Sequence, residues 1–138
     1  MPLIRSTAAI ALVAALLAGT AHAAMPSADD MSPQCQANKA VAVGFMRMVF
    51  VDHMVAQAFE KYVAANFLEH RPLGTPAAPT RASVLAGLTG EFSNGGGPTF
   101  RPVSAVAEGD MVFVKSSNGD VDAYRIKDGK IVEHWQAA

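Results

Sequence analysis

The sequence DAYRIKDGKIVEHWQ, residues 122–136, predicts a β-hairpin close to the end of the chain. Aromatic and β-branched residues stand on both sides of a polar centre, which is typical of two paired strands. The segment Lys127-Asp128-Gly129 supplies the turn. Because the glycine is its third residue, we expect a three-residue loop with Gly129 in the left-handed region.

The length of this loop determines which residues of the hairpin face each other. A three-residue loop pairs Ile126 with Lys130, Tyr124 with Val132, and Asp122 with His134. Side chains alternate between the two faces of a strand. One face would therefore carry Asp122, Tyr124, His134 and Gln136. A two-residue loop would shift the register and break up this set.

The hairpin resembles a known family. An acidic and an aromatic residue precede the pattern Arg-apolar-x-Asp-Gly-Lys-apolar-x-Glu-His-Trp, which is similar to the last hairpin of SnoaL-like proteins. These belong to the nuclear transport factor two-like superfamily, with ketosteroid isomerases and polyketide cyclases. Two further segments are similar to family motifs, FLEHRP at 67–72 and VAEGDMV at 106–112. The resemblance covers roughly residues 36–136.

The first residues have the layout of a secretory signal peptide. Arg5 gives a positive start, residues 8–17 are apolar, and Ala21-His22-Ala23 is a small-x-small cleavage site. The apolar run is too short to span a bilayer. We expect residues 1–23 to be removed, leaving an exported protein, periplasmic or secreted, with no membrane association. Residues 24–35 would form a flexible lead-in and residues 36–138 the SnoaL-like domain.

Composition excludes several classes of function. The chain has 138 residues, about half of them apolar, and a formal charge of −1, which suits one domain with a modest core. No basic block indicates nucleic-acid binding. Cys35 is the only cysteine, so it is either a free thiol or a link between chains. The histidines lack the spacing of a metal site, and no motif for a cofactor is present, so we expect neither.

Periodicity predicts helices first and strands afterwards. Apolar residues recur at helical spacing in three segments, which would begin with caps at Ser32, Asp52 and Thr80. The second helix would run from residue 53 to about residue 64. From Thr99 the period changes to two, which predicts an antiparallel meander of four strands at 99–107, 111–116, 121–126 and 130–136.

This order of elements is an α+β pattern. The resemblance adds that the sheet curves strongly and that the N-terminal helices cover its concave side. The implied architecture is a cone, a cystatin-like roll, with an internal pocket. The resemblance also implies a homodimer formed through the sheet, and Trp135 is a candidate for that surface.

Asp122, His134 and His70 are the candidate catalytic residues. In ketosteroid isomerases a neutral Asp at the position matching Asp122 donates to an oxyanion. The alternative is that Asp122 only pairs with His134 and fixes the sheet. If the pair is catalytic, we expect His134 to act as a base that Asp122 orients. His70 stands where family members often point a histidine into the pocket.

Gln136 departs from the family pattern. SnoaL-type cyclases carry at this position an Asp that acts as a general base, and an amide cannot take that role. Two classes of function therefore remain open. One is an enzyme that transfers a proton on a small apolar carbonyl or aromatic compound, as isomerases, cyclases and aldol enzymes do; the other is a non-catalytic binding or interaction module. In either case we expect the ligand to contact Phe45, Phe59, Tyr62, Tyr124 and Gln136.

Overall fold

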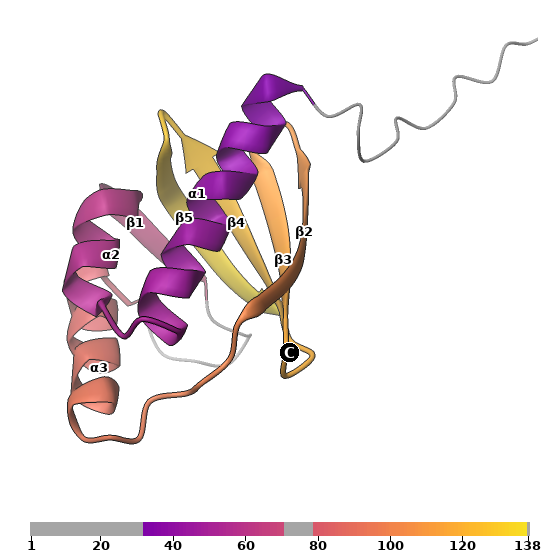
Figure 1. Ribbon diagram of the computed structural model, residues 1–138. Coiled ribbons are helices and arrows are strands. Elements are labelled where there is room, and N and C mark those ends of the chain that lie inside the picture. The colour runs from indigo at the N-terminus through magenta and orange to yellow at the C-terminus, as the bar shows by residue number, and fades with distance from the viewer. Residues whose placement is uncertain (1–31, 71–78, 138) are drawn as a thin grey trace, which may run out of the picture.

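A computed structural model describes residues 32–70 and 79–137 of the chain. Within these ranges three helices lie against a five-stranded sheet (Figure 1). The predicted leader and most of the lead-in fall outside them. The elements in chain order are α1 Pro33–Phe50, α2 Val55–Tyr62, β1 Val63–His70, α3 Arg81–Ser93, β2 Pro102–Glu108, β3 Met111–Ser116, β4 Val121–Lys127 and β5 Lys130–Ala137.

The sheet has the strand order β1-β5-β4-β3-β2. Strands β2 to β5 form the predicted antiparallel meander. The edge strand β1 pairs in parallel with β5 and was not predicted. It begins at Val63, directly after α2, so the prediction of a helix to residue 64 is wrong there. The α+β prediction itself is confirmed.

The helices begin largely where the sequence predicts. The Ser32 side chain accepts a hydrogen bond from the Cys35 N–H, and Thr80 caps α3 in the same way. The second helix differs, because Asp52 does not cap it and its N-cap residue, Met54, makes no side-chain cap bond. The cap bonds of Ser32 and Thr80 satisfy backbone N–H donors that have no partner inside the helix.

The hairpin between β4 and β5 differs from the predicted register. Its loop has two residues, Asp128 and Gly129, both with positive φ, and Lys127 pairs with Lys130. A bulge then leaves Val132 without a partner, since the register passes from Ile126–Ile131 to Arg125–Glu133. Beyond it Tyr124, not Asp122, faces His134 directly, and Asp122 faces Gln136. The shorter loop and the bulge each shift the pairing by one residue in the same direction, so the register ends two residues away from the predicted one. Because a shift of two keeps each side chain on its face, the four residues expected on one face still share it.

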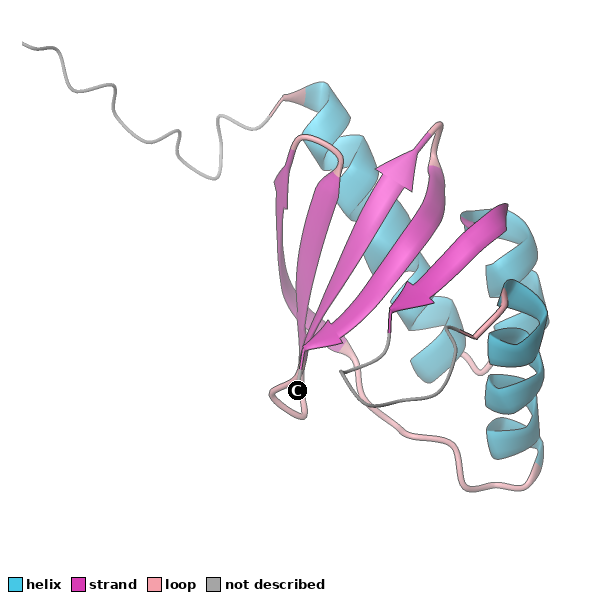
Figure 2. Cartoon of the chain, turned by 180° about the vertical axis from the view of Figure 1, so that it is seen from behind, coloured by secondary structure: helices cyan, strands magenta, loops and turns pink. Residues whose placement is uncertain are grey.

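The core lies between α1 and the sheet. Helix α1 buries Ala42, Phe45, Met46 and Val49, which recur at helical spacing. Strands β3 and β4 bury alternate residues, in keeping with one face toward the core. No described helix crosses the other face of the sheet (Figure 2). Within the described part of the chain, no helix is both long and apolar enough to cross a membrane.

Candidate functional site

A cavity of about 240 Å³ lies between the helices and the inner face of the sheet. This volume is just below the range of roughly 300–1,000 Å³ that is usual for drug-sized ligands, so the space suits a smaller molecule. A larger hollow of about 960 Å³ lies open beside β1, and none of the candidate catalytic residues lines it. The wall of the 240 Å³ cavity includes six aromatic residues, Phe45, Phe50, Phe59, Phe67, Phe100 and Tyr124.

Three polar side chains from neighbouring strands meet in this cavity. Nδ1 of His134 lies 2.9 Å from both carboxylate oxygens of Glu69, and its Nε2 lies 3.0 Å from Oδ1 of Asp122. Glu69 and Asp122 are 7% and 6% exposed. The parallel pairing of β1 with β5 places Glu69 directly beside His134. Asp122 reaches the ring from a position on β4 two residues away from Tyr124, the partner of His134.

The histidine of this triad is positively charged. Burial lowers the pKa of His134, but the hydrogen bonds to Asp122 and Glu69 and the charges of both outweigh this effect and raise the pKa from 6.5 to about 9. At neutral pH both ring nitrogens therefore carry a proton and donate it to a carboxylate. A buried ion pair is tolerated when its charges are compensated by such hydrogen bonds. The triad as a whole carries one net negative charge.

Tyr124 covers one face of this histidine. The two rings stack with centroids 4.8 Å apart, and Phe45 meets Tyr124 edge-on. Burial raises the pKa of Tyr124 well above 10, and the nearby charges of Asp122 and Glu69 raise it further. The hydroxyl therefore stays protonated and can act only as a neutral donor or acceptor.

The geometry reverses the roles expected for the His–Asp pair. Both nitrogens of His134 already face carboxylates, so the imidazolium cannot accept a proton from a ligand. Both oxygens of Glu69 contact the ring. Oδ2 of Asp122 is the one carboxylate oxygen of the triad without a hydrogen-bond partner among the described residues. The group able to act as a base is thus the Asp122 carboxylate, and His134 fixes its orientation by donating to Oδ1.

The structure places most of the expected ligand contacts around the cavity. Phe45, Phe59, Tyr124 and Gln136 line it, with Gln136 exposed at its mouth. Tyr62 does not line it. Its hydroxyl instead lies against Gly44 of α1, where an added Cβ would be 2.5 Å from the oxygen. Tyr62 therefore packs α2 on α1. The expectation that Tyr62 lies in the cavity and contacts the ligand there is corrected.

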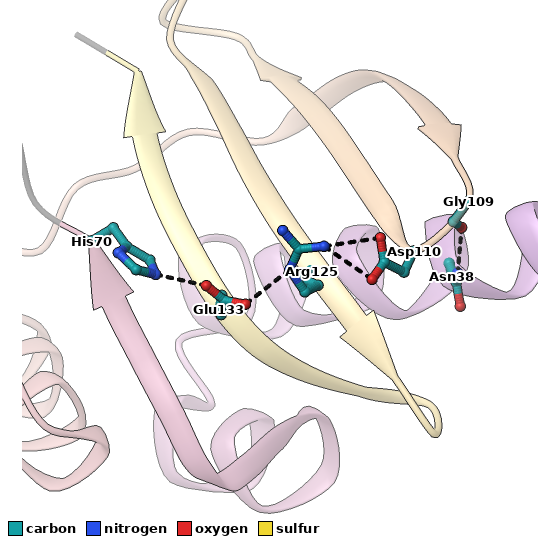
Figure 3. A network of polar contacts seen from close by, with 6 residues as sticks. All are labelled: Asn38, His70, Gly109, Asp110, Arg125 and Glu133. Atoms are coloured by element: carbon teal, nitrogen blue, oxygen red, sulfur yellow. Dashed lines mark hydrogen bonds and ion pairs between the residues drawn. The ribbon is translucent and has the colours of Figure 1, made fainter.

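His70 lies on the opposite face of the sheet, away from the cavity. Its Nε2 is 2.8 Å from Oε2 of Glu133, and its ring stacks on Trp135 at 4.4 Å. Arg125 donates to the other oxygen of Glu133 and to Asp110, so a polar chain crosses this face (Figure 3). The expectation that His70 points into the pocket is wrong, because the residue belongs to a strand and alternation turns it outward.

Glu69 is the site residue that the sequence analysis missed. It lies next to His70, and it enters the cavity because the two side chains point to opposite faces of β1. Alternation along 67–70 would have indicated this, since Phe67 and Glu69 are buried and Leu68 is exposed. The sequence analysis predicted no strand at these residues and therefore did not apply this alternation.

The triad holds residue types that also bind metals. Among the residues that the structure describes, however, no group of three or more such side chains is arranged to hold a metal ion. His134 instead bridges the two carboxylates through both nitrogens, which leaves it no lone pair at neutral pH.

Comparison with known proteins shows likeness in structure but not in sequence. No protein-family model matches the chain, and no curated protein sequence matches it. Among solved structures, IdmH of Streptomyces antibioticus, a proposed polyketide cyclase, is 18% identical with a TM-score of 0.58, over 72% of this chain and 90% of that one. An LEH-like epoxide hydrolase of M. tuberculosis is 10% identical with a TM-score of 0.61, over 75% and 84%.

A third similar structure carries the family name itself. It is a proposed SnoaL-like polyketide cyclase of Jannaschia sp. CCS1, 18% identical with a TM-score of 0.56, over 78% of this chain and 89% of that one. The likeness to these structures shows the fold of the chain, which is the α+β fold shared by the SnoaL-like and NTF-2 like proteins among them.

Proposed function

We propose that this protein binds a small apolar carbonyl or aromatic compound in the 240 Å³ cavity and transfers a proton on it. The observation that carries this proposal is the free Oδ2 of the buried Asp122, whose other oxygen accepts a hydrogen bond from His134, in a cavity with aromatic walls. A carboxylate fixed in this way can accept a proton from a ligand bound beside it.

Each member of the site has a distinct role in this proposal. Oδ2 of Asp122 takes the proton from the ligand, and His134 neutralises the charge on the remaining oxygen when the carboxylate is ionised. Glu69 fixes the ring of His134 and keeps it charged. The Tyr124 hydroxyl stays protonated and is available as a hydrogen-bond donor to a carbonyl oxygen. Asp122 is the catalytic residue, and Glu69 and His134 are positioning residues.

The names of the structural neighbours are compatible with this chemistry. Cyclisation of a polyketide and hydrolysis of an epoxide both need a proton donor or acceptor held in a sheltered cavity. The leader expected at residues 1–23 would direct export of the protein, so the protein would bind its ligand outside the cytoplasm.

Exchange of carbon-bound protons in D₂O tests the proposal without knowledge of the physiological substrate. Small aryl ketones are incubated with the chain, and loss of the α-proton signal is followed by NMR. We expect exchange that Asp122→Asn slows by roughly 100-fold or more, the usual contribution of a positioned base. His70→Ala is the matched control, because His70 lies on the other face, and its exchange rate should equal that of the parent. Equal rates for the parent and Asp122→Asn would reject the assignment.

A non-catalytic binding protein is the second candidate. The observation in its favour is Gln136, which lines the cavity where the cyclases of the resembling family carry a basic Asp. Binding of the ketones without any proton exchange would support this alternative.

A further inference from the structure

The cavity carries more negative than positive charge. Its described lining residues include three carboxylates, Glu69, Glu91 and Asp122, and a single cation, His134. No lysine or arginine is among them. Glu91 is exposed at the mouth, whereas Glu69 and Asp122 are buried at the sheet. A ligand that enters therefore meets a net negative field.

The one positive charge is not accessible to a ligand. Both N–H groups of His134 point at carboxylates, at 2.9 and 3.0 Å, and Tyr124 covers a face of the ring. The Asp122 side chain, in contrast, is 8% exposed, and its Oδ2 has no hydrogen-bond partner among the described residues. This oxygen is not sealed off from the cavity, so it can accept a hydrogen bond from a donor or a positive charge on a ligand.

The aromatic wall favours the same kind of ligand. Phe45 meets Phe59 and Tyr124 edge-on, with centroids 5.5 and 6.2 Å apart, and Phe59 meets Phe67 in the same way. Two of these rings already lie against cations, because Arg81 lies over the Phe59 ring, 5.6 Å from its centroid, and the ring of His134 stacks on Tyr124. A ring face is the negative part of the quadrupole of an aromatic ring. Ring faces attract organic cations, most strongly where water is excluded.

We propose that the ligand of this cavity is a small organic cation, a protonated amine with an apolar body of about one ring. The ammonium group would lie at Oδ2 of Asp122, and the body would lie between the rings of Phe45, Phe59 and Tyr124. This inference rests on the proposed function in using the same cavity and the same carboxylate. It keeps the aromatic body of the ligand and adds a positive charge, and an ammonium group bound at Oδ2 would compete with a proton-transfer substrate for that oxygen. The cavity volume of about 240 Å³ sets the limit on size.

Three probes of nearly equal size test the charge of the ligand directly. Benzylamine is a cation, benzyl alcohol is its neutral counterpart, and benzoate is an anion. We expect NMR titration of the parent chain at fixed ionic strength to show benzylamine binding about tenfold more tightly than benzyl alcohol. Benzoate should show no saturable binding.

Variants then locate the binding group. Asp122→Asn should weaken the binding of benzylamine about tenfold and change the affinity for benzyl alcohol by less than about twofold, because the substitution removes only the charge. The exposed Glu108 on β2 does not line the cavity, so Glu108→Gln is the control for long-range charge effects and should change neither. If Asp122→Asn does not fold, the three probes on the parent chain still decide the question.

The outcomes separate this inference from the proposed function. Equal binding of benzylamine and benzyl alcohol overturns the cationic ligand and leaves an apolar binding cavity in place. If benzoate binds more tightly than the other two probes, the cationic ligand is overturned as well, because the cavity then prefers a negative charge. Absence of saturable binding for all three probes overturns both the cationic ligand and the ligand-binding cavity on which the proposed function rests.

Discussion

At the residue scale, His134 makes the stability of the fold depend on pH. Burial lowers the pKa of His134, and the hydrogen bonds and charges of Asp122 and Glu69 raise it to about 9 from 6.5. Because the pKa is higher in the folded chain, this stabilisation is fully present below pH 6.5 and is lost as the pH rises through 9. We expect the free energy of unfolding, from urea titrations, to fall by roughly 2–3 kcal/mol between about pH 6 and pH 9.5.

The variant His134→Gln provides the comparison for this prediction. Its amide can donate a hydrogen bond but does not titrate, so its free energy of unfolding should change much less over the same pH range. A parent chain that is as stable at pH 9.5 as at pH 6 would contradict the charged state assigned to His134.

Glu69 should control the pKa of His134. The variant Glu69→Gln removes one of the two negative charges that raise this pKa, while it keeps the size of the side chain. We expect the pKa of His134, followed by NMR of the ring protons, to fall by at least about one unit. Glu133→Gln is the matched control, because Glu133 contacts His70 on the other face. If both variants leave His134 unchanged, Glu69 does not act on the ring.

The site could be predicted from the sequence only in part, and the reason lies in single residues. Asp122 and His134 belong to a strongly alternating hairpin, so their common face was evident. His70 and Glu69 are adjacent, and a choice between them requires knowing that the segment is a strand. Its Val63–Leu68 irregularity also interrupts the alternation. The charge of His134 could not be predicted without Glu69.

At the scale of elements, the turn at Asp128–Gly129 sets the register of the site. Gly129 has a φ of +72°, a conformation that side chains with a Cβ rarely adopt. Gly129→Ala should therefore lower the free energy of unfolding by about 1–2 kcal/mol in urea titrations. A slipped register would also move His134 away from Glu69, which the NMR titration of its ring would report.

Gly90 of α3 is the matched control for this substitution. It is exposed inside the helix, and an added Cβ would meet nothing within 4 Å. Gly90→Ala should raise the free energy of unfolding by about 0.5–1 kcal/mol, because alanine restricts the unfolded chain and favours helix. Equal effects of the two substitutions would show that the turn conformation does not limit the hairpin.

The bulge at Val132 explains why a wrong loop length still gave the right face. Glycine at the third position suggested a three-residue loop, but Asp128 also adopts positive φ, and Asp-Gly is a favoured two-residue turn. The local sequence cannot show the compensating bulge, because it depends on how β5 pairs with both β4 and β1. In the same way, β1 is stabilised by pairing with β5 from the far end of the chain, which a local pattern does not contain.

At the scale of the whole molecule, the face of the sheet opposite the helices carries exposed apolar residues beside the polar chain from His70 to Asp110. A row of paired residues crosses all five strands there, Val106–Phe113–Ala123–Trp135–His70. Val106 is 63% exposed and Phe113 is 41% exposed. We propose that a second copy of the chain covers this surface, as the family resemblance leads us to expect, because contiguous apolar patches on a sheet mark interfaces.

Val106→Lys should convert such a dimer into a monomer. In a two-fold interface every residue occurs twice, so one substitution buries two positive charges, which is costly without partners. Sedimentation velocity should show the parent as a dimer at micromolar concentration and the variant as a monomer at least in part. Met54→Lys introduces the same charge at an exposed apolar residue before α2, away from the sheet face, and should leave the dimer intact. A monomeric parent, or a dimer that survives Val106→Lys but not Met54→Lys, would place the interface elsewhere.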